Sequence, residues 1–221
     1  MENPADTMLE SVHAEIERAC KASKRRAGDV TLIAVSKTHP AQRIAPMIAA
    51  GQRVFGENRV QEAQEKWPAL REQHADIELH GIGQLQSNKA EDAVALFDCI
   101  HALDRPSLVK ALAKAMDKAG KQVPCFIQVN IGAEAQKGGC LPADLPGLIG
   151  SARDADIPVA GLMCLPPAAI EPAPFFAHLA KLAADNGLAS LSMGMSNDYP
   201  IAVQLGASHI RVGSALFGAR G

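Results

Sequence analysis

The chain has 221 residues, 48% of them hydrophobic, and its 22 basic and 24 acidic residues give a formal charge of −2. A chain of this size can bury a sizeable core, and its balanced charge argues against a nucleic-acid-binding surface. It has neither an apolar stretch of membrane-spanning length nor the charged-then-apolar start of a signal peptide. We therefore expect one cytoplasmic domain over residues 1–221, with no membrane partner.

The cysteines and histidines point to no metal site in the sequence. The five cysteines are scattered without a C-x-x-C pair, and the seven histidines show no paired ligand spacing. This pattern is typical of reduced thiols in a cytoplasmic protein rather than of a disulfide framework. We expect neither disulfides nor a bound metal.

The chain opens with a predicted amphipathic helix over residues 5–25, in which Met8, Val12, Ile16 and Cys20 recur every four residues. Short apolar segments, expected to be strands, then follow at 30–35, 53–55, 77–80, 97–100, 124–129, 157–161, 189–191 and 208–212. Between them, helices are predicted over 41–50, 58–73, 87–95, 104–119, 142–153, 174–186 and 197–205.

This alternation of strand and helix predicts a parallel sheet. Eight units in so short a chain favour a closed (β/α)8 TIM barrel preceded by an extra N-terminal helix. An open, doubly wound sheet is the alternative that the pattern alone allows.

Polar residues follow the predicted strands, where a barrel carries its functional loops. Lys37 comes two residues after the apolar segment 30–35. Desolvation at a barrel mouth favours the neutral amine that condenses with an aldehyde. A lysine that extends from a strand end into water is the competing interpretation.

A phosphate site is predicted in the last two loops. Residues 192–198 place a glycine and hydroxyls at a strand-to-helix turn, with Ser196 as the expected N-cap, and Gly213 and Ser214 follow the last strand. Barrels often bind phosphate with the loops after strands 7 and 8. A cap that serves only its helix is the alternative.

Other motifs are incomplete or have simpler explanations. Residues 81–86 begin like a dinucleotide-binding fingerprint, but Gln86 occupies the position of the third glycine. We interpret Glu57 and Glu62 as helix-dipole partners on a solvated surface rather than as an acid/base pair.

Six sequence blocks closely resemble the YggS/PROSC family of pyridoxal phosphate homeostasis proteins. The likeness runs in order from about residue 30 to the C-terminus. It implies the barrel of the alanine racemase N-terminal domain, bound pyridoxal 5′-phosphate (PLP), a monomer, and little catalysis. The blocks are LIAVSKTHP, FGENRVQE, HGIGQLQSNK, GLMCLPP, LSMGMSNDYPIAV and HIRVGSALFGAR.

The resemblance also implies roles for particular residues. Lys37 would form the Schiff base with PLP, Asn58 would lie near the cofactor ring, and Arg211 would face the pyridine nitrogen. Gly81 stands where many members have a bulkier apolar residue, a change expected to enlarge the pocket.

The resemblance further assigns the remaining pocket positions. Ser196, Gly213 and Ser214 would hold the phosphate, and His80 and Met163 would line the pocket.

Three functions compete at this point. The first is a PLP carrier or regulator that delivers the cofactor transiently to PLP-dependent apoenzymes. The second is a PLP-dependent amino-acid racemase of low activity. Its second base would have to be Cys164 or His80, because the only tyrosine, Tyr199, lies beside the predicted phosphate helix. The third is a barrel used only for protein interactions. An arginine facing the ring nitrogen favours the first, because it discourages ring protonation.

Overall fold

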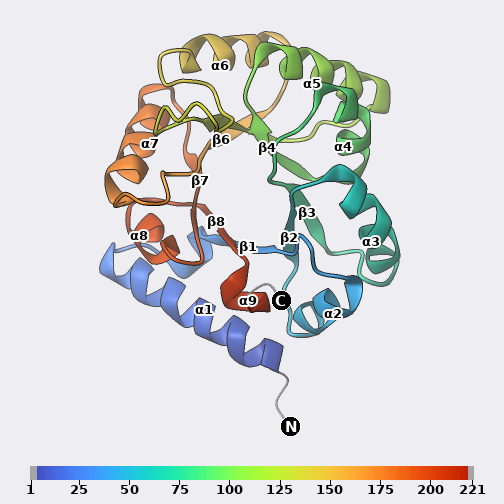
Figure 1. Ribbon diagram of the computed structural model, residues 1–221, viewed down its shortest axis with the longest axis vertical. Coiled ribbons are helices and arrows are strands. Elements are labelled where there is room, and N and C mark those ends of the chain that lie inside the picture. The colour runs from blue at the N-terminus through green and yellow to red at the C-terminus, as the bar shows by residue number, and fades with distance from the viewer. Residues whose placement is uncertain (1–3, 219–221) are drawn as a thin grey trace.

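The computed structural model describes residues 4–218, within which eight parallel strands close into a barrel in chain order (Figure 1). Each strand pairs with the next, and β8 pairs with β1 in the register Ile33 to Arg211. The predicted closed barrel is therefore confirmed over the open sheet. The strands are β1 (Thr31–Val35), β2 (Val54–Glu57), β3 (Glu78–Gly81), β4 (Cys99–Leu103), β5 (Cys125–Val129), β6 (Val159–Cys164), β7 (Ser190–Met195) and β8 (His209–Val212).

Helices cover the outside of the barrel (Figure 1). The α-helices are α1 (Pro4–Ala22), α2 (Ala41–Ala49), α3 (Val60–Gln73), α4 (Ala90–Leu96), α5 (Pro106–Ala119), α6 (Leu145–Asp154), α7 (Ala173–Asp185), α8 (Tyr199–Gln204) and α9 (Ser214–Phe217). Two 3-10 turns, η1 (Ala27–Asp29) and η2 (Ser87–Lys89), precede β1 and α4. Among the described residues, no helix is both long and apolar enough to cross a bilayer.

Helix α1 packs beside α8 and α9 on the outside of the barrel (Figure 1). Its buried face includes Val12 and Ile16 as predicted, but Leu9 is buried and Met8 is exposed. A helix turns every 3.6 residues, so a strict spacing of four drifts off the buried face. Arg25, just after α1, donates to the carbonyls of Val203 at 2.6 Å and Ala207 at 2.8 Å, which anchors this segment to the end of α8.

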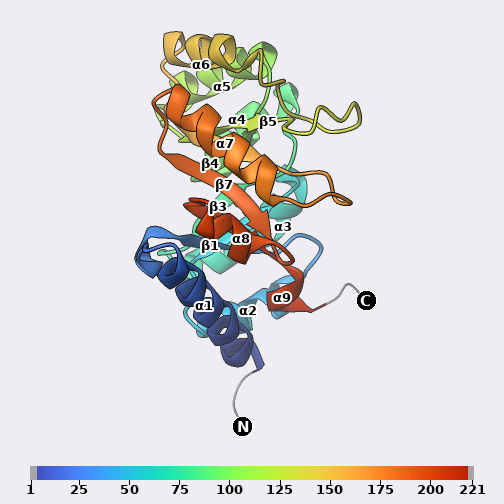
Figure 2. The ribbon, with the colours of Figure 1, turned by 90° about the vertical axis from the view of Figure 1, so that its left-hand side faces the viewer.

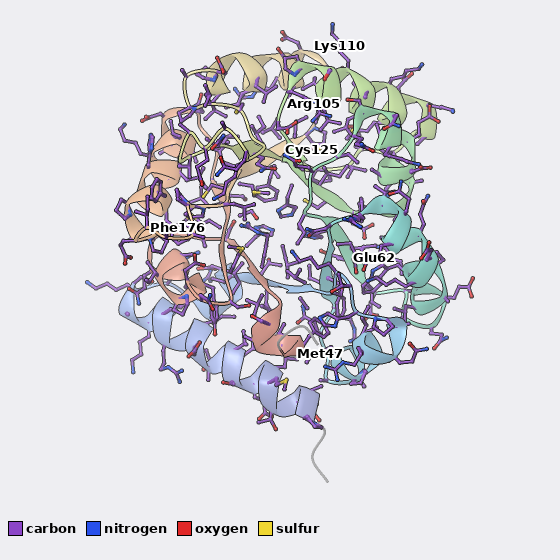
Figure 3. All side chains as sticks on the ribbon, viewed as in Figure 1. Met47, Glu62, Arg105, Lys110, Cys125 and Phe176 are labelled. Atoms are coloured by element: carbon purple, nitrogen blue, oxygen red, sulfur yellow. The ribbon has the colours of Figure 1, made fainter. Side chains whose placement is uncertain are left out.

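The interior of the molecule has two apolar parts. The larger core lies between the sheet and the helices and includes Trp67 and Phe176. A smaller cluster, formed by Cys99, Phe126 and Met163, lies inside the ring of strands. Side chains fill this ring (Figure 3), so the barrel is a packed core and not a pore.

The loops after β5 and β6 extend on the same side of the barrel as α9 (Figure 2). This side holds the C-terminal ends of the strands, where the predicted functional residues follow β1, β2, β7 and β8. We refer to it as the C-terminal mouth and to the opposite end as the N-terminal mouth.

Candidate functional site

Lys37 lies in a tight turn directly beyond β1. Its side chain is half-buried, and the next residue, Thr38, has a φ of 65°. This left-handed conformation is strained for a β-branched residue. The Thr38 N–H donates to Glu62 Oε1 at 2.5 Å, which holds the turn in place.

A buried polar network supports this turn from below. Glu57 is fully buried at the end of β2, and its Oε1 accepts from Ser36 Oγ at 2.6 Å and from Trp67 Nε1 at 3.0 Å. Lys66 Nζ lies 2.8 Å from the same oxygen. It also donates to the carbonyls of Ser36 at 2.9 Å and His39 at 3.1 Å, so it ties down the backbone on both sides of Lys37.

The prediction that Glu57 lies on a solvated surface was therefore wrong, whereas Glu62 lies in the first turn of α3, as expected of a helix-dipole partner. Strand β2 extends through Glu57, which brings this carboxyl into the core. Glu62 is partly buried, which opposes its ionisation, but hydrogen bonds from Lys66 and the Thr38 N–H outweigh burial and lower its pKa. Both groups organise the turn that carries Lys37.

Arg211 is buried inside the barrel. Its guanidinium donates to Ser192 Oγ at 2.5 Å and to the Cys164 carbonyl at 2.8 Å, which fixes its position. Burial lowers its pKa to about 10. The group therefore stays protonated near neutral pH and can only donate hydrogen bonds.

A chain of hydrogen bonds continues from Arg211 toward the N-terminal mouth. Ser192 Oγ lies 2.9 Å from His101 Nδ1, and His101 Nε2 lies 3.0 Å from His80 Nδ1. Ser192 accepts from Arg211, and its hydroxyl can still donate to His101, which can then donate to His80. Burial holds the pKa of His101 well below its usual value, which keeps the imidazole neutral.

The structure does not bring His80 to the C-terminal mouth. It lines a cavity at the N-terminal mouth together with Glu78 and His209. A chain of hydrogen bonds through His101 and Ser192 connects His80 to Arg211.

The loops after β7 and β8 meet at the C-terminal mouth. The Gly213 N–H donates to Ser196 Oγ at 3.1 Å, and Ser214 is exposed at the start of α9. Ser196 is not the N-cap of the following helix, because α8 begins at Tyr199, after Asp198. Ser196 instead connects the two loops.

Asn58, half-buried after β2, lines a cavity of about 340 Å³. Met163 is buried on β6 in the interior cluster. Gly81 lines the same cavity, and the Phe97 ring lies 2.8 Å from where a Cβ of residue 81 would stand.

Lys66 and Trp67 were missed by the sequence analysis. They lie on the predicted helix 58–73, and their contacts with Glu57 depend on where strand β2 ends. The signal in the sequence was the pair Lys66-Trp67, one helical turn after Glu62.

Residues 13–221 match the family described as alanine racemase, N-terminal domain. The chain is 40% identical over 220 residues to a pyridoxal phosphate homeostasis protein of Pseudomonas aeruginosa, covering 96% of this chain and 94% of that one. It is 37% identical to the protein of the same name in Escherichia coli, covering 96% and 95% of the two chains.

Solved structures agree with the sequence relatives. PipY of Synechococcus elongatus, solved with PLP bound, is 38% identical and superposes with a TM-score of 0.81 over 92% of this chain and all of that chain. Alanine racemase of Streptomyces coelicolor, 21% identical, shares the barrel fold with a TM-score of 0.68 over 96% of this chain and 59% of that chain. The chain therefore belongs to the family of pyridoxal phosphate homeostasis proteins.

Proposed function

We propose that the protein binds PLP and acts in intracellular PLP homeostasis, holding the cofactor as a reversible Schiff base on Lys37. The observation that carries the proposal is the position of Lys37 in a strained turn, fixed by Glu62 and Lys66, at the C-terminal mouth. The relative PipY, solved with PLP bound, supports the choice of cofactor.

The donors at the C-terminal mouth suit this cofactor. A phosphate group brings about two negative charges at neutral pH. The Ser196 hydroxyl and the Ser214 amide at the start of α9 are donors of the kind that binds a phosphate. The Gly213 amide, which donates to Ser196 Oγ in this structure, is proposed to turn to the phosphate when PLP binds. Asn58 is proposed to lie near the ring, and Met163 to line the pocket from β6.

Arg211 limits the chemistry of the site in this proposal. PLP, when bound, supplies an electron-withdrawing ring that stabilises negative charge on an amino acid. A permanently protonated guanidinium opposite the pyridine nitrogen discourages ring protonation and weakens this effect. Ser192 and the Cys164 carbonyl keep the guanidinium in place. We therefore propose a carrier rather than an efficient enzyme.

A racemase would need a second base, and the side chains that could serve are engaged elsewhere or are hard to deprotonate. The Tyr199 hydroxyl donates to Glu15 of α1, and His80 lines the cavity at the N-terminal mouth. Burial raises the pKa of Cys164 to about 12, which opposes its use as a base. These contacts favour the carrier over the racemase.

We further propose a cytoplasmic location and transient delivery of PLP to PLP-dependent apoenzymes. The five cysteines are unpaired and buried, which suits a reducing compartment. A reversible bond to Lys37 allows release to an acceptor.

Amino-acid turnover by the PLP-loaded protein distinguishes a carrier from an enzyme. The loaded protein is incubated in deuterated water with L- and D-alanine and other amino acids. We expect racemisation and α-deuterium exchange far below the range of about 1–1000 per second usual for enzymes. Turnover within that range would assign the protein to the racemases.

A further inference from the structure

The N-terminal mouth of the barrel contains a second cluster of chemically capable side chains. A cavity of about 650 Å³ there is lined by Glu78, His80, Cys99 and His209, among others. It lies at the end of the barrel opposite to Lys37. The proposed PLP site makes no use of Cys99 or of this cavity.

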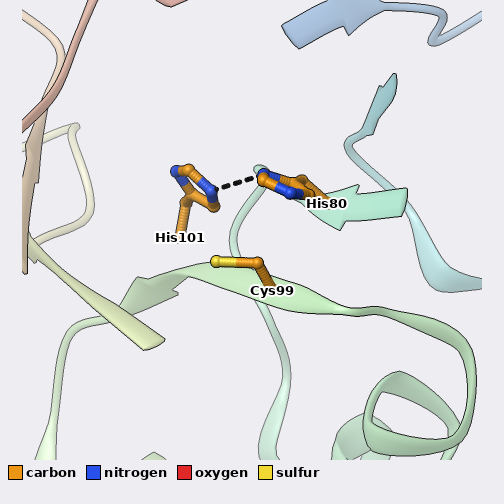
Figure 4. Close-up of side chains that lie close together, drawn as sticks. All are labelled: His80, Cys99 and His101. Carbon is orange, nitrogen blue, oxygen red and sulfur yellow. Dashed lines mark hydrogen bonds between the residues drawn. The ribbon is translucent and has the colours of Figure 1, made fainter. Parts of the chain in front are cut away.

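Two adjacent strands bring three ligand-type side chains together. His80 on β3 is the register partner of Cys99 on β4, and His101 follows Cys99 by two residues on the same face of the sheet. Each offers a ligand atom, and the three atoms lie within 4.8 Å of one another. Figure 4 shows the two imidazoles and the thiol converging on one small volume.

We propose that His80, Cys99 and His101 bind one divalent transition-metal ion of the zinc type, with the fourth position open to the cavity. Thiolates and imidazoles are ligands that zinc binds, and catalytic zinc sites combine three protein ligands with an open fourth position. Zinc–nitrogen bonds of about 2.0–2.1 Å place two tetrahedral nitrogens about 3.3 Å apart. His80 Nδ1 and His101 Nε2 are 3.0 Å apart, close to that spacing. Cys99 Sγ lies within 4.8 Å of a ring nitrogen of each histidine and would move inward to reach the ion.

Neighbouring residues are placed to orient the two proposed histidine ligands. Ligand histidines usually give their other N–H to an oxygen acceptor, such as a carboxylate, a backbone carbonyl or water. His80 Nε2 lies 3.7 Å from Glu78 Oε2, and His101 Nδ1 lies 2.9 Å from Ser192 Oγ. On metal binding, the Cys99 thiol would release its proton to solvent. The His101 ring proton would shift from Nε2 to Nδ1 and be donated to Ser192 Oγ, whose own hydroxyl hydrogen would turn to another acceptor. The thiolate and the nearby Glu78 carboxylate then balance a dication.

This proposal departs from the expectation of no metal site. That expectation used spacing along the chain, and His80 and Cys99 are far apart in it. Their proximity arises from the pairing of β3 with β4.

Cobalt(II) is the probe for this site, because cobalt bound to a thiolate gives a charge-transfer band in the near ultraviolet. The EDTA-treated full chain is titrated with Co²⁺ and, by calorimetry, with Zn²⁺. We expect one ion per chain and a thiolate–cobalt band in the unaltered protein. Absence of the band, or no Zn²⁺ binding at micromolar concentrations, would overturn the proposal without any variant.

Two variants test which thiol is the ligand. Cys99→Ser should abolish the band and weaken Zn²⁺ binding by at least about tenfold. Cys20→Ser, at another buried thiol, on α1, should preserve both the band and Zn²⁺ binding. Circular dichroism and PLP binding verify that each variant is folded. A band that survives in folded Cys99→Ser, or is lost in folded Cys20→Ser, would refute the assignment.

Discussion

Lys66 connects the buried Glu57 carboxyl to the turn that carries Lys37. Its ammonium lies 2.8 Å from Glu57 Oε1 and donates to the Ser36 and His39 carbonyls. The Glu57 side chain is fully buried, and that of Lys66 is 9% exposed. Removing one member of such a pair leaves an uncompensated buried charge. Lys66 thus supports both the fold and the position of Lys37.

Lys66→Met should therefore destabilise the protein by about 3–5 kcal/mol and weaken PLP binding. Lys118→Met is the matched control, because Lys118 pairs with Glu91 on the exposed surface. Such a pair contributes about 0–1 kcal/mol. Urea denaturation of both variants measures the difference. Equal stability losses in the two variants would contradict the supporting role of Lys66.

His209 gives the stability of the fold a pH dependence. Burial lowers its pKa to about 4 in the folded protein, against 6.5 for an unperturbed histidine. Between these values, the unfolded chain binds a proton that the folded protein does not. Stability should therefore be highest above about pH 6.5 and fall as the pH drops toward 4, by at most about 1.4 kcal/mol per pH unit for this group.

Urea denaturation at pH 7 and pH 5, with EDTA present, measures this dependence. His209→Gln should show a smaller loss between the two pH values than the unaltered chain. His178→Gln, at an exposed position on α7, should retain the full loss. An unchanged pH dependence in His209→Gln would show that another group is responsible.

At the scale of elements, the contact between the β7 and β8 loops forms the proposed phosphate site. The Ser196–Gly213 hydrogen bond holds the two loops together. Charge-assisted hydrogen bonds contribute about 1.5–3 kcal/mol each. Several of them acting on one phosphate would dominate the affinity for the cofactor.

Pyridoxal, which lacks the phosphate, should therefore bind at least about a hundredfold more weakly than PLP. Ser196→Ala should weaken PLP binding and leave pyridoxal binding nearly unchanged. Ser151→Ala, on the exposed face of α6, is the control. Titration followed by visible absorbance gives all the affinities, and equal affinities for the two aldehydes would exclude this phosphate site.

At the scale of the whole molecule, one chain of hydrogen bonds joins the two mouths of the barrel. It runs from Arg211 through Ser192 and His101 to His80. The proposed metal site therefore shares a network with the proposed PLP site.

The architecture was predictable from the sequence because its signals are local. Each strand is a short apolar segment bounded by polar residues, and the alternation with helices requires a parallel sheet. The order of the loops at the C-terminal mouth follows from this topology, so the proximity of Ser196 and Gly213 was predictable too.

Features that depend on strand ends and strand register were not predictable. Glu57 is buried because β2 runs two residues beyond the predicted strand, a difference that local sequence does not resolve. His80 faces the cavity at the N-terminal mouth, where it contacts His101. The His101 ring in turn stacks on Phe126. These contacts join residues far apart in the chain.

The identity of the lysine that binds PLP tests the account most directly. The protein is loaded with PLP, reduced with borohydride and digested, and the modified peptide is mapped by mass spectrometry. The account predicts a label on Lys37 and the loss of that label in Lys37→Ala. A main product on any other lysine of the unaltered chain would contradict it.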